Sequence, residues 1–236
     1  YFSKEWLIPR DEYYRMHNLD PKRKLITYAS SFITFAPNYL NIEALARLVA
    51  EDQLTEPCQL LIRLHPNHFM EEPLYKDEGE RARALARSLP NVHVVEPVAL
   101  GGDLGYYSGE DMPEKTSMMA YSDVFTTVYS TMCVETAIHE RPIVSVCIDT
   151  PGGWNKAHKF SLKLSKIGDW PTHQRFRQAG AGRVAFDAAQ LKQHLNTYLA
   201  DPSLDADKRS KFIRDEITFT DGSAGRRTGE YLFTLL

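Results

Sequence analysis

Short apolar runs alternate with amphipathic stretches along this chain of 236 residues, and no other feature constrains the fold as strongly. Apolar runs bounded by turn residues are typical of strands buried in a parallel sheet. The expected strands are residues 24–29, 58–64, 91–96, 124–128, 142–148 and 184–186. The expected helices are residues 10–17, 39–51, 78–88, 110–121, 173–178, 188–199, 205–215 and 224–236. Because strands and helices alternate, we predict an α/β, Rossmann-like, mostly parallel six-stranded sheet with helices on both faces.

The first residues differ in character from the rest of the chain. Residues 1–23 are aromatic and charged, with Pro9 and Pro21 as helix breakers, and the chain starts at Tyr1 rather than Met. We predict that residues 1–23 are an entry segment or a linker from a missing N-terminal domain. Residues 24–236 are then one nucleotide-donor-binding domain.

Composition excludes several functional classes. A formal net charge of −3 gives no electrostatic basis for binding nucleic acid. No apolar run approaches the roughly 18 residues of a membrane span. The three cysteines, Cys58, Cys133 and Cys147, fall in expected buried elements without metal-ligand spacing. We expect reduced thiols and a cytoplasmic location, with any peripheral attachment to the inner face of the cell membrane made through absent regions or partners.

The strand at residues 58–64 ends abruptly in His65-Pro66. This places the histidine at the carboxyl edge of the sheet, where ligands bind in open α/β folds. Pro66 excludes helical backbone at His65, and the imidazole can donate to a phosphate oxygen. Arg63, two residues earlier, is expected to point to the same side and to add positive charge. The alternative is a plain turn beside a surface arginine.

A second candidate follows the strand at residues 124–128. Ser130 and Thr131 precede a short helix, MCVETAIHE, and a further strand. Serine and threonine are favoured helix N-caps, and a helix N-terminus also attracts phosphate. Glu135 lies one turn into this helix and can accept from ribose hydroxyls, although it could equally be an acid paired with a neighbouring base.

Other motifs give weaker signals. Ser30 and Ser31 end the first strand and, being small, would let a phosphate approach the backbone. The dinucleotide motif GxGxxG and the P-loop motif are both missing from the sequence. His158 lies in a long loop and either lines the cleft or is a solvated loop histidine. The remaining histidines lack metal-ligand spacing, so we predict no metal site.

Several blocks occur in an order that resembles a known family. They are KLITYASS, LLIRLHPNHF, NVHVVEP, SMMAYSDV, VYSTMCVETAIHERPIVSV and FTDGSAGRRTGEYLFTLL. Together they resemble the C-terminal, donor-binding half of GT-B glycosyltransferases, in the branch of CDP-glycerol glycerophosphotransferases and capsule or surface-polysaccharide transferases. The resemblance covers about residues 25–236. It departs from the family where Ser30-Ser31 replaces the glycine-rich loop that often follows the first strand.

The resemblance implies roles for individual residues. His65 would be the catalytic residue and would contact the donor phosphate together with Ser130 and Thr131. Glu135 would hold the ribose, and the backbone around Glu96, Pro97 and Val98 would meet the base. The reaction would need no metal or other cofactor. The missing N-terminal domain would carry the acceptor site, so this fragment alone could be inactive.

The predicted partners follow from this resemblance. They are a nucleotide-activated sugar or CDP-polyol as donor, and a polysaccharide or lipid-linked acceptor. Two other functions stay open from the sequence. One is a nucleotide-sugar epimerase of the related fold, and the other is a non-catalytic nucleotide- or sugar-binding module.

Overall fold

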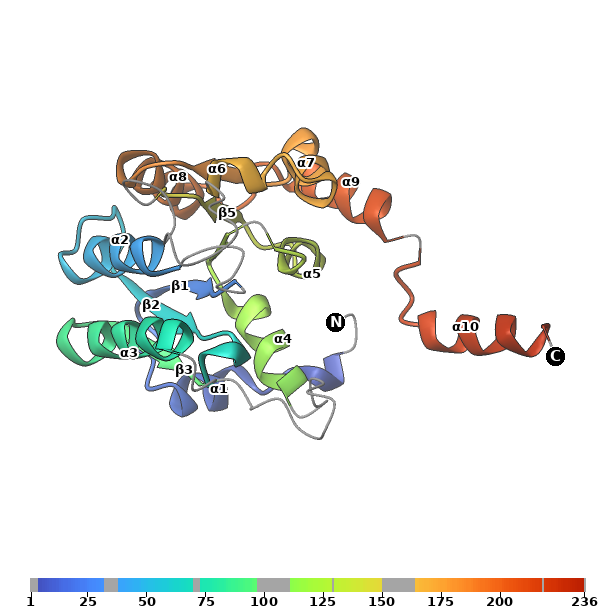
Figure 1. The fold of residues 1–236 in the computed structure, drawn as a ribbon, viewed down its shortest axis with the longest axis horizontal. Helices are drawn as coiled ribbons and strands as arrows, with labels where there is room; N and C mark the ends of the chain where they lie inside the picture. Colours follow the sequence, from blue (N-terminus) through green and yellow to red (C-terminus); the bar gives the residue numbers. More distant parts are fainter. Residues whose placement is uncertain are drawn as a thin grey trace.

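A six-stranded, all-parallel sheet forms the centre of the molecule in the computed structural model (Figure 1). The structure describes residues 4–31, 38–69, 73–96, 111–128, 130–149, 164–217 and 219–235. Its strand order, β3-β2-β1-β4-β5-β6, is the doubly wound order of a Rossmann fold. The predicted fold class is therefore confirmed. The strands are β1 (Lys24–Ala29), β2 (Cys58–Arg63), β3 (Val92–Val95), β4 (Val124–Thr127), β5 (Ile143–Val146) and β6 (Arg183–Ala185).

The helices connect these strands. They are α1 (Arg10–Met16), α2 (Tyr39–Ala50), α3 (Pro73–Ser88), α4 (Met112–Tyr121), α5 (Met132–Ile138), α6 (Leu164–Ile167), α7 (Pro171–Ala179), α8 (Ala188–Ala200), α9 (Ala206–Glu216) and α10 (Ala224–Phe233). Two short 3₁₀ helices, η1 (Lys4–Trp6) and η2 (Pro66–Phe69), complete the described elements. Helix α3 begins at Pro73, earlier than the predicted residue 78, since proline suits the first helical position.

Alternating strand residues divide the core into two apolar layers. Ile26 and Ile62 face the layer that includes residues of α2 and α8. Leu25 and Leu61 face the opposite layer, which includes residues of α1, α4, α5 and α9. Figure 1 shows α2 and α3 on one side of the strands and α4 and α5 on the other. All six residues of β2 are buried, as expected for a strand covered on both faces.

The entry segment packs against this core. Tyr13 is fully buried, Tyr14 and Leu19 are nearly so, and all three join the layer under α4. The backbone N–H of Ile8 donates to Ser117 Oγ of α4 at 2.9 Å. The entry segment therefore contributes buried side chains to the core, while its predicted origin in a preceding domain stays a prediction.

The C-terminal helix differs from every other long element. Helix α10 buries none of its residues, and it projects away from the sheet and its two layers (Figure 1). Its apolar side chains are exposed, with Tyr231 at 64%, Leu232 at 55% and Phe233 at 77% of their accessible surface. An apolar surface of this kind on a helix is typical of an interaction site.

Candidate functional site

Three loops begin side by side at the carboxyl edge of the sheet. Ala29 of β1 is in register with Arg63 of β2 and with Thr127 of β4. Two residues further along each chain, Ser31 and His65 lie at the same level, and Ser130 follows one residue later. Because neighbouring strands are about 4.8 Å apart, the ends of β2 and β4, which lie on either side of β1, are about 10 Å apart. That His65 and Ser130 share one phosphoryl group stays a prediction.

The imidazole of His65 has a defined tautomer. Its Nδ1 atom accepts the backbone N–H of Asn67 at 3.2 Å, so the ring proton of the neutral form sits on Nε2. The pKa of His65 is lowered to about 4, chiefly by burial, and the nearby His68 and Arg63 act in the same direction. At neutral pH the ring is therefore uncharged and can act as an N–H donor from Nε2.

The end of β1 is bonded to its neighbours mainly through backbone groups. The N–H of Ser30 donates to the carbonyl of Arg63 at 3.0 Å, and that of Ser31 donates to Asn38 Oδ1 at 2.8 Å. Ser30 Oγ is buried and has no hydrogen-bond partner among the described residues. A buried hydroxyl without a partner is uncommon and costs free energy, so it is a candidate ligand contact.

The start of α2 is capped by a side chain from another helix. Asn38 occupies the N-cap position, but its side chain makes no cap hydrogen bond, because its Oδ1 accepts from Ser31 N–H and from the hydroxyl of Tyr28. Instead, Glu78 of α3 accepts the backbone N–H groups of Asn38 at 2.5 Å and Tyr39 at 2.9 Å.

The same carboxylate also reaches the loop after β2. His68 Nε2 lies 3.0 Å from Glu78 Oε2, and His68 Nδ1 lies 3.0 Å from both the backbone nitrogen and the carbonyl oxygen of His65. His68 is 3% exposed and Glu78 is 6% exposed, so this contact is shielded from water. Glu78 thus links the His65 turn to the start of α2.

Ser130 and Thr131 lie before α5, as predicted. Ser130 Oγ accepts the backbone N–H of Met132 at 3.2 Å, whereas Thr131 makes no side-chain cap bond and is exposed. Glu135 Oε2 pairs with Lys115 Nζ of α4 at 2.8 Å. The pairing of Glu135 with a neighbouring base is thus observed, and its predicted role at a ribose stays a prediction.

Arg63 has a different environment from the one expected. Its guanidinium is buried and pairs with Glu114 Oε2 at 2.9 Å and with the carboxylate of Asp111. Burial alone would lower the pKa of Arg63, but Glu114 and Asp111 outweigh it and the pKa is raised. Two carboxylates match this charge, so Arg63 adds no net positive charge at the edge. Its assignment as a phosphate ligand stays a prediction.

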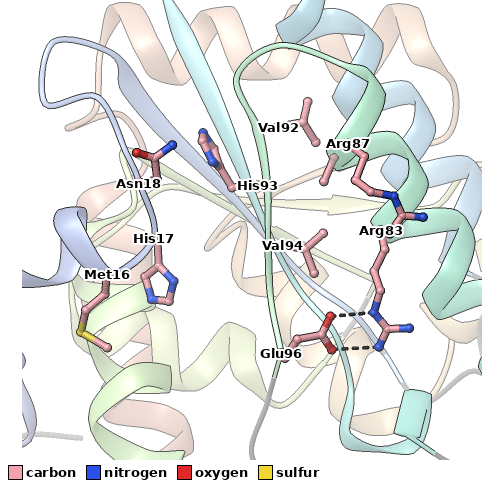
Figure 2. Close-up of a pocket in the computed structure, with 10 residues that line it drawn as sticks. Met16, His17, Asn18, Arg83, Arg87, Val92, His93, Val94 and Glu96 are labelled. Carbon is pink, nitrogen blue, oxygen red and sulfur yellow. Dashed lines mark hydrogen bonds and ion pairs between the residues drawn. The ribbon is translucent and has the colours of Figure 1, made fainter.

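A cavity of about 460 Å³ opens beside the outer edge strand β3 (Figure 2). Val92 and Val94 line its floor, while His17 and Arg87 lie on opposite sides. Glu96 lines it too, held by Arg83 through contacts of 2.6 and 2.9 Å. The predicted base contacts at Pro97 and Val98, and the candidate cleft residue His158, lie outside the described residues.

Comparison with solved structures identifies the fold. The wall teichoic acid polymerase TagF, in a variant soaked with CDPG, superposes with a TM-score of 0.57 at 16% identity. The C-terminal CMP-Kdo binding domain of WaaA from Acinetobacter baumannii superposes with a TM-score of 0.50 at 18% identity, over 86% of this chain and 95% of that domain. This chain has the fold of a GT-B C-terminal half. A putative UDP-N-acetylglucosamine 2-epimerase from Listeria monocytogenes matches it with a TM-score of 0.51 at 14% identity.

This chain spans less than half the length of the TagF and epimerase chains that it matches. The TagF match spans 98% of this chain and 45% of the TagF chain, and the epimerase match spans 88% and 42%. No protein-family model matches the sequence, and no curated protein does so. At these identities the likeness establishes the fold alone.

Among the described residues, no group of three or more His, Cys, Asp or Glu side chains is placed to hold a metal ion. No described helix is both long and apolar enough to cross a membrane.

Sequence reasoning missed the roles of His68 and Glu78 in the GT-B half. A signal for His68 was present, since residues three apart eclipse in a 3₁₀ turn and His65-Pro-Asn-His68 forms one. Glu78 gave no comparable signal, because its contact with Asn38 joins residues 40 positions apart.

Proposed function

We propose that this chain is the donor-binding half of a glycosyltransferase, or of a polyol-phosphate transferase, that uses a nucleotide-activated donor in cell-surface polysaccharide synthesis. The observation that carries the proposal is the alignment of Ser31, His65 and Ser130 in adjacent loops at one sheet edge. Ligands of open α/β sheets bind at this edge. The GT-B fold supports the same reading.

The chemistry of these residues suits a departing nucleotide phosphate. In group transfer the bond between the donor group and the nucleotide phosphate breaks, and negative charge grows on the phosphate oxygens. His65 would donate its Nε2–H to one oxygen, and Ser130 and Thr131 would present hydroxyls beside the N-terminus of α5. These groups would stabilise the leaving group, so we propose a metal-independent reaction.

Other residues would complete the donor site. The buried hydroxyl of Ser30 lacks a partner in the described structure and would donate a hydrogen bond to the nucleotide substrate, with Ser31 beside it. Glu135 would hold the ribose, and Glu96, Pro97 and Val98 would meet the base. His158 would line the cleft. Arg63 would contact the donor phosphate only by giving up part of its pairing with Asp111 and Glu114.

The central test is the variant His65→Ala. We expect it to weaken nucleotide binding by about tenfold, the scale of one lost hydrogen bond to a charged group, without unfolding the domain. Calorimetry with CMP, CDP, UDP and GDP measures this affinity and also identifies the base. The matched control is His194→Ala, a substitution midway along α8, which should bind like the wild type. Equal affinities of the His65 variant and the wild type would refute the assignment.

Helix α10 gives the proposal an architectural test. We propose that its exposed apolar residues pack against an N-terminal half that carries the acceptor site for a polysaccharide or lipid-linked acceptor. Leu232→Ser combined with Phe233→Ser should weaken association with a separately produced N-terminal half, because the buried apolar area is lost. Arg226→Ser on the same helix is the control. Undiminished association of the double variant would exclude α10 from the interface.

An epimerase is the second candidate, because the fold also matches a putative 2-epimerase. A transferase and an epimerase would both bind the nucleotide-sugar at this sheet edge, so binding does not separate them and the reaction product must be analysed. Incubating the full-length protein with the nucleotide-sugar that binds, with no acceptor present, should leave the sugar configuration unchanged if the protein is a transferase. A binding module that lacks catalysis would retain the nucleotide affinity and give no turnover with donor and acceptor together.

A further inference from the structure

A buried polar network connects the loops at the candidate edge. At its centre is the carboxylate of Glu78, which contacts His68 through one oxygen and the first N–H groups of α2 through the other. Asn38 extends the network, because its Oδ1 accepts from Ser31 N–H and from Tyr28, and its Nδ2 donates to the carbonyl of Ser31. Loops after β1 and β2 are therefore joined beneath the surface that would face a donor.

Each contact constrains backbone that carries a proposed ligand residue. His68 closes the turn of His65 at both of that residue's backbone groups: its Nδ1 accepts the N–H of His65 at 3.0 Å, and its own backbone N–H donates to the carbonyl of His65 at 2.9 Å. Asn38 holds both backbone groups of Ser31: its Oδ1 accepts the N–H of Ser31 at 2.8 Å, and its Nδ2 donates to the carbonyl of Ser31 at 3.1 Å. A displacement of Glu78 would release both loops together.

We infer that His68 and Glu78 are positioning residues, which orient the His65 turn and the Ser31 loop toward one shared phosphoryl group. This inference rests on the proposed function for its ligand, and on the geometry of the network for its mechanism. Neither side chain touches the donor in this account. Both act by fixing backbone, because burial excludes the water that would otherwise replace a missing partner.

The network also defines the proton position on His68. With Glu78 as acceptor, the neutral ring carries its proton on Nε2 and accepts the N–H of His65 at Nδ1. Glutamine at position 78 has one oxygen and one amide. If that oxygen accepts from Asn38 and Tyr39, the amide faces Nε2, and the proton of His68 must move to Nδ1. There it would donate to the carbonyl of His65 and leave the N–H of His65 without an acceptor.

The test measures both the tautomer of His68 and the affinity of the protein for nucleotide. In wild-type protein, ¹⁵N NMR of the imidazoles should show His68 protonated at Nε2, and Glu78→Gln should move that proton to Nδ1 and shift the ring signals of His65. The nucleotide from CMP, CDP, UDP or GDP that binds the wild type should bind Glu78→Gln and His68→Leu about tenfold more weakly, the scale of one lost hydrogen bond to a charged group. His68→Asn places an amide near the position of Nδ1 and should recover part of the loss.

Controls separate the possible failures. His194→Gln on α8 should leave both readouts unchanged, and thermal melts of each variant report whether it folds. If His68→Leu does not fold, Glu78→Gln and His68→Asn carry the test. Unchanged His65 signals or unchanged affinity in folded Glu78→Gln and His68→Leu would overturn the inference. If instead His65→Ala binds nucleotide like the wild type, the proposed function fails, while the ¹⁵N measurement still decides whether the network positions His65.

Discussion

Replacing Arg63 with methionine should lower the free energy of unfolding by about 3–5 kcal/mol, because the change leaves two buried carboxylates without their cation. Glu114 is 2.9 Å from Arg63 Nε, and Asp111 contacts the same guanidinium. Glu114 also accepts the hydroxyl of Tyr13 at 3.1 Å, so the loss would reach the entry segment. Urea denaturation followed by circular dichroism measures the change.

Two further variants make this result specific. Arg47→Met removes an exposed pair with Glu43 on α2 and should leave the free energy of unfolding nearly unchanged, because water and salt screen that pair. Combining Arg63→Met with Asp111→Asn and Glu114→Gln should recover part of the stability, because no unpaired charge remains. If Arg63→Met keeps its stability and loses nucleotide affinity, Arg63 is a phosphate ligand, as the sequence suggested, and its ion pairs are of minor importance.

Acid should destabilise the protein through His65. The pKa of His65 is lowered to about 4 in the folded protein, and that of an unfolded histidine is about 6.5. The unfolded chain therefore binds a proton first as the pH falls, so stability decreases from about pH 6.5 to about pH 4 and then levels off. The shift corresponds to a loss of up to about 3 kcal/mol.

The comparison that isolates this effect is wild type against His65→Gln. His139 also has its pKa lowered to about 4 by burial, so the wild-type curve alone does not identify the residue. Between pH 7 and pH 4 the free energy of unfolding of the wild type should fall by up to about 3 kcal/mol more than that of His65→Gln, because the glutamine variant lacks the histidine contribution. Parallel curves for the two proteins would mean that His65 is not buried in its neutral form.

The sheet could be predicted because its information is local. Apolar runs such as that of β2 identify strands, and amphipathic spacing identifies α2 and α8, so a parallel sheet with helices on both faces followed from their alternation. The position of His65 at a strand end followed from the same pattern. The partners of Arg63 and Glu78 did not, because Asp111 and Asn38 are distant in sequence and are selected by packing.

Charged side chains in the candidate site show this limit most clearly. Arg63, Glu96 and Glu135 were each considered for contact with a ligand, and each is paired in the structure, with Asp111 and Glu114, Arg83 and Lys115 respectively. The sequence shows that a residue is charged, but it does not show which residue of opposite charge pairs with it. The uncharged groups, His65, Ser30 and Ser130, lie at the strand ends and the helix start where the sequence predicted them, and their contacts with a ligand stay predictions.

The carboxylate of Glu78 at the start of α2 has a consequence for ligand choice. Rossmann domains that bind dinucleotides direct the helix after the first strand at the pyrophosphate. Here the positive end of that helix is already occupied by an anion of the protein itself, at 2.5 and 2.9 Å from its first amides. We therefore expect the first amides of α2 not to bind a phosphate. A donor phosphoryl group would be held instead by the loops that follow β1, β2 and β4.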